Sequence, residues 1–136
     1  MSLRDSSLKS LRPDVITGTV KSEMSTEEYF QNSVLRPIIK FQNDMIIAVF
    51  LNFSNKYKNV FFDLSAEKKI TYIENAIAKD STFRNNLKDM IIGLFTVQEY
   101  NQYTNNASAL NKRIVTIIKE RLISHIQLLS KMGPTA

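Results

Sequence analysis

Apolar residues recur at intervals of three and four along most of this sequence, and no other feature constrains its fold as strongly. Between Phe30 and Tyr57 they fall on one face of a helix. Ser25, with Glu28 three residues later, fits a capping box at the start of that helix. No run of alternating apolar and polar residues, the mark of half-buried strands, is present. The sequence therefore predicts an all-α protein.

The first long helix is expected over about residues 26–57, and it contains Pro37. Proline removes a backbone hydrogen bond and clashes with the preceding turn, so it kinks or breaks a helix. The apolar stripe keeps its phase across Pro37, which favours a kinked helix. Ile47 and Leu51 fall opposite this stripe, and we expect the helix to be buried on more than one side.

Capping residues divide the chain that follows into further helices. Ser65 precedes one helix, and Asp80 or Ser81 precedes the next. Thr96 with Glu99 forms a second capping box, which predicts a short helix after it.

The last helix is expected over about residues 107–131, and its apolar arc covers about half of the circumference. So wide an arc places the helix between two others or against a second subunit. We predict a compact bundle of about five helices, with residues 25–132 as a single domain. Residues 1–24 lack periodicity and are expected to form an extended arm, in which residues 15–20 suit a short strand, and residues 133–136 form a tail.

The residue types that the chain lacks exclude several classes of functional site. Cysteine is absent, which excludes disulfides, thiol catalysis, thiolate-bound metals and Fe–S clusters. His125 is the only histidine, so no metal centre with two or more imidazoles can form. The three glycines leave no loop that could cradle phosphates. No metal ion or other cofactor is expected.

The hydropathy pattern bears on where the protein works. The longest apolar run, Met45–Leu51, falls far short of the roughly 18 residues of a membrane span. The N-terminus lacks the apolar core of a secretory signal. We therefore expect a cytoplasmic protein that has no membrane partner.

The net charge of +5 lies almost wholly at the C-terminal end, where residues 108–136 carry five basic side chains and one acidic side chain. No aromatic residues are interleaved with them for stacking on bases. Either they contact nucleic-acid phosphates or they form a solvated helix face, which we favour. The residues that share one arc of the predicted last helix are Lys112, Arg113, Lys119 and Lys131.

A second candidate site is a small polar pocket between the first and last long helices. Arg121 and His125 lie four residues apart within the apolar arc of the last helix, and Gln42 lies in the apolar stripe of the first. A buried arginine must be paired and a buried amide must be hydrogen-bonded. In a ligand site, Arg121 would hold an anion and His125 would move protons. The alternative, which we favour, is that Arg121 extends its charged end to solvent and His125 is a satisfied core residue.

The acidic residues give little support for catalysis. Most of them lie at predicted helix starts, where they complement the helix dipole, or on solvent faces. No serine occupies a nucleophile elbow. We assign no catalytic residue and disfavour an enzyme.

Six short runs carry a resemblance to a known group of proteins: Phe30–Asn32, Leu35–Ile38, Phe41–Asp44, Tyr72–Ile77, Phe83–Asn85 and Ser108–Arg113. They resemble short all-helical bacterial proteins of unknown function, some of which carry the name glyoxalase. The resemblance covers about residues 25–129 and implies an all-helical fold. The usual glyoxalases need several His, Glu and Gln metal ligands on a βαβββ scaffold or a His-rich dinuclear zinc site. This sequence has one histidine and no strand pattern. The resemblance therefore implies no mechanism and no site residues.

These observations favour a small non-enzymatic interaction module that forms a homodimer. The homodimer rests on the wide apolar arc of the last helix and on Ile47 and Leu51, which would leave an apolar patch on a monomer. Two alternatives stay open. One is a nucleic-acid- or ribosome-associated factor that uses the basic stripe, and the other is a small-ligand or enzymatic pocket between the first and last long helices.

Overall fold

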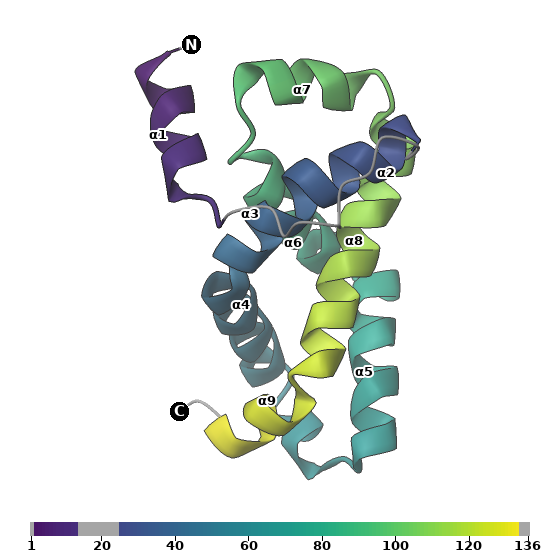
Figure 1. The fold of residues 1–136 in the computed structure, drawn as a ribbon. Coiled ribbons are helices and arrows are strands. Elements are labelled where there is room, and N and C mark those ends of the chain that lie inside the picture. Colours follow the sequence, from purple (N-terminus) through teal and green to yellow (C-terminus); the bar gives the residue numbers. More distant parts are fainter. Residues whose placement is uncertain (1, 14–24, 134–136) are drawn as a thin grey trace. The chain divides into compact units, whose positions relative to one another are not determined.

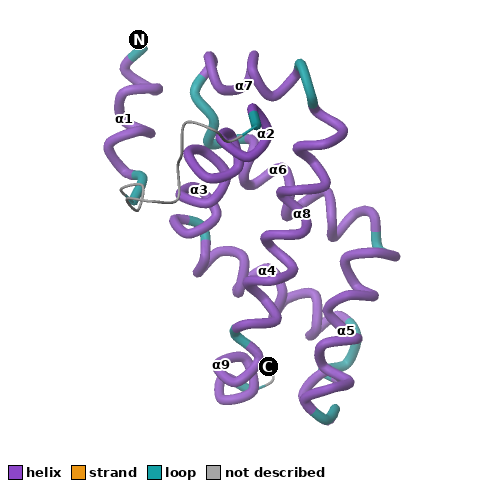
Figure 2. The backbone as a smooth tube through the Cα atoms, turned by 45° about the vertical axis from the view of Figure 1, so that its right-hand side comes forward, coloured by secondary structure: helices purple, strands orange, loops and turns teal. Residues whose placement is uncertain are grey.

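The computed structural model describes residues 2–13 and 25–133, and every regular element in these ranges is helical, as the colours of Figure 2 show. The all-α prediction is confirmed, but the prediction of about five helices is wrong because the long helices are interrupted. None of the described helices is long and apolar enough to cross a membrane. The elements, labelled in Figure 1, are α1 (Leu3–Leu11), α2 (Thr26–Phe30), a π-helical turn (Gln31–Leu35), α3 (Arg36–Phe41), α4 (Asn43–Lys56), a 3₁₀ turn (Val60–Asp63), α5 (Ala66–Lys79), α6 (Ser81–Ile92), α7 (Val97–Thr104), α8 (Ala107–Ser124) and α9 (Ile126–Met132).

The chain forms two compact units. The first consists of Met1–Gln42 and Lys88–Ile114, and the second of Asn43–Leu87 and Val115–Ala136. Helices α1, α2, α3 and α7 belong to the first unit, and α4, α5 and α9 belong to the second. Helices α6 and α8 each contribute residues to both. The expected single domain over residues 25–132 stays a prediction.

Helix α1 corrects the prediction of an extended N-terminal arm. Residues 3–11 are helical, and the Ser2 side chain caps the helix by accepting a hydrogen bond of 3.1 Å from the Asp5 backbone nitrogen. The prediction failed because α1 has no apolar stripe: Leu3 and Leu11 are both exposed. The short strand expected within residues 15–20 lies outside the described residues.

The kink expected at Pro37 takes the form of a π-helical turn immediately before it. A wider turn relieves the clash between the proline ring and the preceding carbonyl groups. It also uses one extra residue, so Leu35 and Ile39 join Phe30, Val34 and Ile38 on the buried face. The predicted stripe therefore holds at Val34 and Ile38, but the prediction that it keeps its phase is wrong from Phe41 onward, because Phe41 and Met45 are exposed.

The core of the first unit lies where α2, α3, α6, α7 and α8 present apolar residues. The ring of Phe95 packs edge-on against Phe30, with 5.6 Å between centroids, and contacts Tyr103 at the same separation. The other core side chains of this unit are Val34, Leu35, Ile38, Ile39, Ile91, Leu110 and Ile114. Ser25 and Thr96 are N-caps as predicted: Ser25 accepts from the backbone nitrogen of Glu28, and the full reciprocal capping box is formed by Thr96 and Glu99.

The core of the second unit is an aromatic cluster. Phe50 is fully buried and packs edge-on against Phe61 at 5.0 Å, and Phe53 stacks on Phe83 at 4.2 Å. Helix α5 begins at the Ser65 cap as predicted, with Ile73 and Ile77 buried, but Ile70 is exposed. Ile47 and Leu51 are buried too. Ile47 and Leu51 therefore do not contribute to an exposed apolar patch, and the homodimer stays a prediction.

The predicted continuous last helix over residues 107–131 is wrong, because it breaks at His125. There the backbone has φ −100° and ψ 14°, which separates α8 from α9. Apolar periodicity marks the buried face of a helix and is insensitive to a single residue that leaves helical geometry. Gly133, at φ +68°, ends α9.

Candidate functional site

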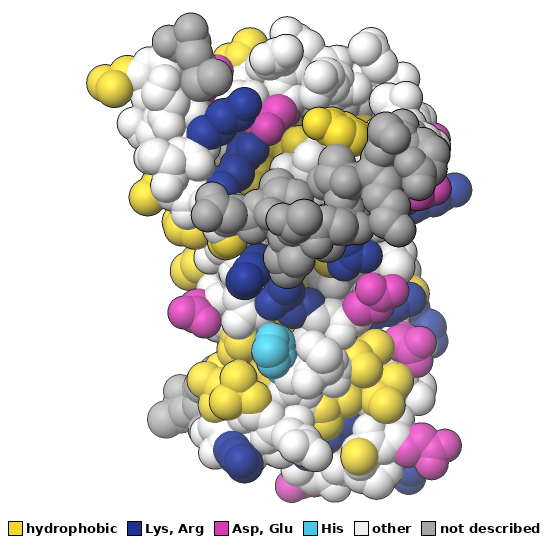
Figure 3. Space-filling view, in the orientation of Figure 1, with side chains coloured by type: hydrophobic (Ala, Val, Ile, Leu, Met, Phe, Trp, Pro, Cys, Tyr) yellow, Lys and Arg dark blue, Asp and Glu magenta, His cyan; other side chains and the backbone are white. Residues whose placement is uncertain are grey.

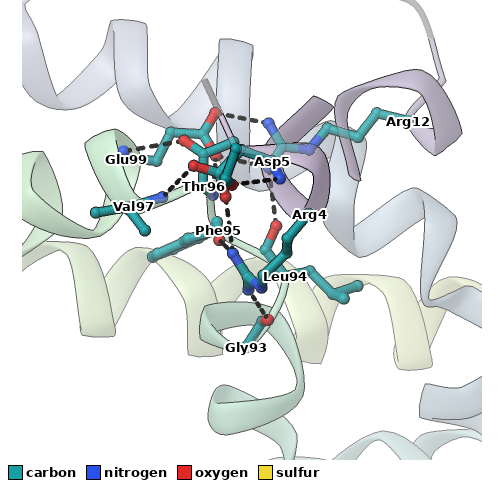
Figure 4. A network of polar contacts seen from close by, with 10 residues as sticks. Arg4, Asp5, Arg12, Gly93, Leu94, Phe95, Thr96, Val97 and Glu99 are labelled. Atoms are coloured by element: carbon teal, nitrogen blue, oxygen red, sulfur yellow. Dashed lines mark hydrogen bonds and ion pairs between the residues drawn. The ribbon is translucent and has the colours of Figure 1, made fainter. Parts of the chain in front are cut away.

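Helix α1 is bound to the loop between α6 and α7 by hydrogen bonds that its charged side chains form. The Arg4 guanidinium donates to the carbonyl oxygens of Phe95 and Gly93 at 3.0 and 2.9 Å. The Asp5 carboxylate accepts from the backbone nitrogen of Val97 at 3.2 Å. Figure 4 shows these side chains converging on the loop from α1. They satisfy backbone groups that the end of α6 and the start of α7 leave without intrahelical partners.

The strongest contact of this network joins Arg12, just after α1, to Glu99 in the first turn of α7. Two nitrogens of the guanidinium each donate to one carboxylate oxygen at 2.6 Å, and only 11% and 9% of the two side chains is exposed. A third hydrogen bond of 2.9 Å runs from Arg12 to the carbonyl oxygen of Leu94. The buried Arg12 Nε has no acceptor in the described part of the chain, and this reduces the stabilisation that the other Arg12 contacts provide.

Glu99 serves the local fold and the ion pair at once. One carboxylate oxygen accepts from the backbone nitrogen of Thr96 at 2.8 Å, which completes the capping box predicted for α7. Burial alone would raise the pKa of Glu99, but the hydrogen bonds and charge of Arg12, together with Thr96, outweigh it and lower the pKa. Glu99 is therefore held ionised at neutral pH.

A pocket of about 570 Å³ lies beside this ion pair, within the first unit. Its volume falls in the range of roughly 300–1,000 Å³ that is typical of small-ligand sites. The space-filling view shows basic side chains gathered beside α1, next to an acidic one (Figure 3). The floor of the pocket is apolar and buried, and it is formed by Phe30, Val34, Pro37 and Leu110.

One wall of the pocket is a row of amide side chains on α7. Gln98, Gln102 and Asn105 follow each other at intervals of four and three residues, so they share one face of the helix. All three are exposed, and their side chains form no hydrogen bond within the described ranges of the chain. The row therefore presents donors and acceptors that no protein group uses.

The pocket is also lined by a second carboxylate, Glu27 of α2. It accepts hydrogen bonds from Asn106 at 2.8 Å and from Arg113 at 3.2 Å. The Asn106 bond lowers the pKa of Glu27 most, and Arg113 lowers it further. Lys9 also lines the pocket, and it forms no ion pair with any residue that the structure describes.

The three residues of the polar pocket predicted from the sequence take part in two separate sets of contacts: Arg121 and His125 in one, and Gln42 in the other. Arg121 and His125 both approach the side-chain oxygen of Asn43, at 3.0 and 3.1 Å. Gln42 donates instead to the carbonyl oxygen of Met90 in the first unit, at 3.2 Å. The structure thus pairs Arg121 and His125 as the spacing suggested, and a ligand at these residues stays a prediction.

The basic stripe predicted for nucleic acid is divided by the fold. Arg113 donates to Gln31 and Glu27, so its charge is neutralised within the first unit. Lys131 lies on α9, beyond the break at His125, while Lys112 and Lys119 remain on α8. Nucleic-acid binding by these residues stays a prediction, with Arg113 already engaged.

The amide row was visible in the sequence, although our sequence analysis assigned it no function. Five amide residues occur within the nine positions 98–106, and three of them have the spacing of one helix face: Gln98, Gln102 and Asn105. What the sequence could not show is that the arginine of a distant segment would close one end of the pocket. Arg12 and Glu99 are 87 residues apart.

Among the described residues, no three His, Cys, Asp or Glu side chains gather in a way that could hold a metal ion. Comparisons with protein-family models, with curated proteins and with solved structures gave no match. The candidate site therefore rests on its geometry.

Proposed function

We propose that this protein is a non-enzymatic binding module and that its ligand binds in the pocket of the first unit. The observation that carries this proposal is the row of unused amides, Gln98, Gln102 and Asn105, beside a buried apolar floor. An apolar surface with a few convergent polar groups is the usual composition of a ligand site. The proposal keeps the cytoplasmic location and the homodimer that the sequence predicts.

The state of the two carboxylates favours binding over catalysis. A general acid or base works best with a pKa near the operating pH. Glu99 and Glu27 both have lowered pKa values, and arginine holds each of them in place. Ionised and immobilised carboxylates suit the shaping of a pocket and do not suit proton donation at neutral pH.

The test is a titration with benzamide, whose ring suits the apolar floor and whose amide suits the row. At about 0.4 kcal/mol for each of its non-hydrogen atoms, so small a probe should bind with a Kd of roughly 2 mM. In ¹⁵N-resolved NMR spectra, we expect the side-chain NH₂ signals of Gln98 and Gln102 to shift with saturation. Asn101 lies on the same helix but outside the pocket, so its signal should stay in place.

A matched pair of variants completes the test. Gln102→Ala should weaken benzamide binding, and Asn101→Ala should leave it unchanged, because both positions are exposed on α7. If benzamide at tens of millimolar shifts no signal of the pocket, the proposed function is wrong.

A further inference from the structure

The amide row on α7 has a spacing that suits one class of ligand in particular. We propose that the pocket binds an extended peptide segment that carries a carboxylate, an inference that rests on the proposed function. Three features of the pocket support it: the spacing of the amides, the apolar floor and the unpaired charge of Lys9.

The first step concerns the amides. Each carboxamide presents a donor and an acceptor side by side and can pair with a backbone N–H and C=O group. Gln98 and Gln102 are four residues apart, which places them about 6 Å apart along the helix axis. In an extended chain, backbone groups on one edge repeat every two residues, or about 6.8 Å. Long glutamine side chains absorb the difference, so the row matches one edge of an extended peptide.

The second step concerns the floor. Side chains of an extended segment point alternately to opposite sides. With one backbone edge on α7, every second side chain of the peptide faces Phe30, Val34 and Leu110. The exposed fractions of these three residues are 6%, 7% and 3%. Phe30 is held edge-on against Phe95, so the floor is formed before a ligand arrives. An apolar residue at every second position of the peptide fits this arrangement.

The third step concerns charge. Arg12 and Glu99 neutralise each other, and Glu27 is neutralised by Arg113. Lys9 is the remaining charge among the described residues that line the pocket. It lies in the last turn of α1, where it also complements the helix dipole. A peptide with a carboxylate near this end gains an ion pair, whereas a lysine-rich peptide is repelled.

The experiment uses the full chain and an acetylated, amidated hexapeptide of alternating leucine and aspartate, followed by fluorescence polarisation of a labelled form. The double variant Gln98→Ala/Gln102→Ala should weaken binding about tenfold or more, because each lost hydrogen bond corresponds to roughly a two- to tenfold change. Lys9→Ala should weaken it about threefold, as expected for an exposed ion pair. The matched controls Asn101→Ala and Lys112→Ala, both exposed and outside the pocket, should stay within a factor of two.

Backbone recognition is tested separately from side-chain recognition. Methylating alternate backbone nitrogens removes the donors from one edge of an extended peptide and leaves the other edge intact. Of the two possible peptides, one should lose binding and the other should bind as the parent does. If both bind as tightly as the parent, or if the double variant binds normally, the peptide proposal is wrong.

The remaining outcomes separate this inference from the proposed function. If benzamide binds and the hexapeptide does not, the peptide class alone is overturned. A second hexapeptide, in which lysine replaces each aspartate, tests the charge. If it binds as well as the leucine–aspartate peptide, the proposed role of the carboxylate is wrong. If benzamide shifts no signal of the pocket, the proposed function is wrong and the peptide inference falls with it.

Discussion

Helix α1 is held to the first unit by charged side chains, whereas the centre of the second unit is held by aromatic rings. Arg4 and Arg12 fasten α1 to loop carbonyls and to Glu99, while Leu3 and Leu11 stay exposed. Phe50 and Phe61 in the second unit have no exposed surface at all. Ring packing is insensitive to pH, but an ion pair depends on the protonation of its carboxylate. The difference teaches that α1 can be released by conditions that leave the aromatic core intact.

The largest effect that we expect comes from emptying the aromatic core. Phe50→Ala removes a fully buried ring that contacts Phe61, Tyr72 and Phe83. The loss in the free energy of unfolding should be about 3–5 kcal/mol, measured by urea denaturation. Val60→Ala, at an exposed position of the same unit, is the control and should change stability by less than about 0.5 kcal/mol. An equally small loss for Phe50→Ala would refute the central role of the ring.

The next effect in size should come from Arg12→Ala. This change leaves Glu99 without its partner, and the loss should be about 2 kcal/mol, as for hydrogen bonds to charged groups. Because α1 contributes no fully buried apolar side chain, we expect it to detach while the rest of the chain stays folded. Hydrogen exchange should show faster exchange across residues 3–11 and unchanged protection in α5. Arg36→Ala, which removes an exposed arginine bonded to Asn32, should change neither.

A smaller effect is expected at the start of α7. Thr96→Ala removes the side chain that accepts from the Glu99 backbone nitrogen at 3.2 Å, and N-cap losses cost about 1 kcal/mol. Thr104→Ala, at the exposed end of the same helix, should cost less than half of that. Because Thr96 and Arg12 both contact Glu99, their effects should not add in a double variant. Strict additivity in urea denaturation would argue against a shared role of Glu99.

The smallest effect should be the response to acid. The folded pKa of Glu99 lies below its ordinary value of 4.5, so its ionised form stabilises the docked α1 above that pH. This contribution is lost as the pH falls through the folded pKa. A protonated Glu99 still accepts hydrogen bonds, which limits the loss. The pH dependence of hydrogen exchange in α1 should be measured in the wild type and in Glu99→Gln, and the difference between the two isolates the effect. An identical pH response in both proteins would exclude Glu99 as its source.

Local signals in the sequence predicted those elements whose stability is local. Ser65 and Thr96 were correctly predicted as N-caps because a cap needs only its own first turn. Helix α1 was missed because its contacts come from residues about 90 positions away, such as Phe95 for Arg4. No periodicity within residues 3–11 records such partners.

The candidate site shows the same division. Gln98 and Gln102 could be placed on one helix face from the sequence, because spacing alone decides that. Phe30 and Val34 of the apolar floor also lie on the predicted stripe, whereas the burial of Leu35 and Ile39 could not be predicted, since the π-helical turn adds them to the buried face. The ion pair of Arg12 with Glu99, which lines the pocket, could not be predicted either, because nothing in the sequence connects two charges that are 87 residues apart.

The π-helical turn at Gln31–Leu35 has a consequence for how such chains change over generations. Geometrically it behaves as one residue inserted into an α-helix, which turns everything after it by about 100°. A relative that lacks one codon between Phe30 and Leu35 would keep the same buried face with an unbroken helix. Tolerance of insertions and deletions is therefore expected inside this helix, where length is usually most constrained, and an alignment that forbids a gap here would mispair its residues.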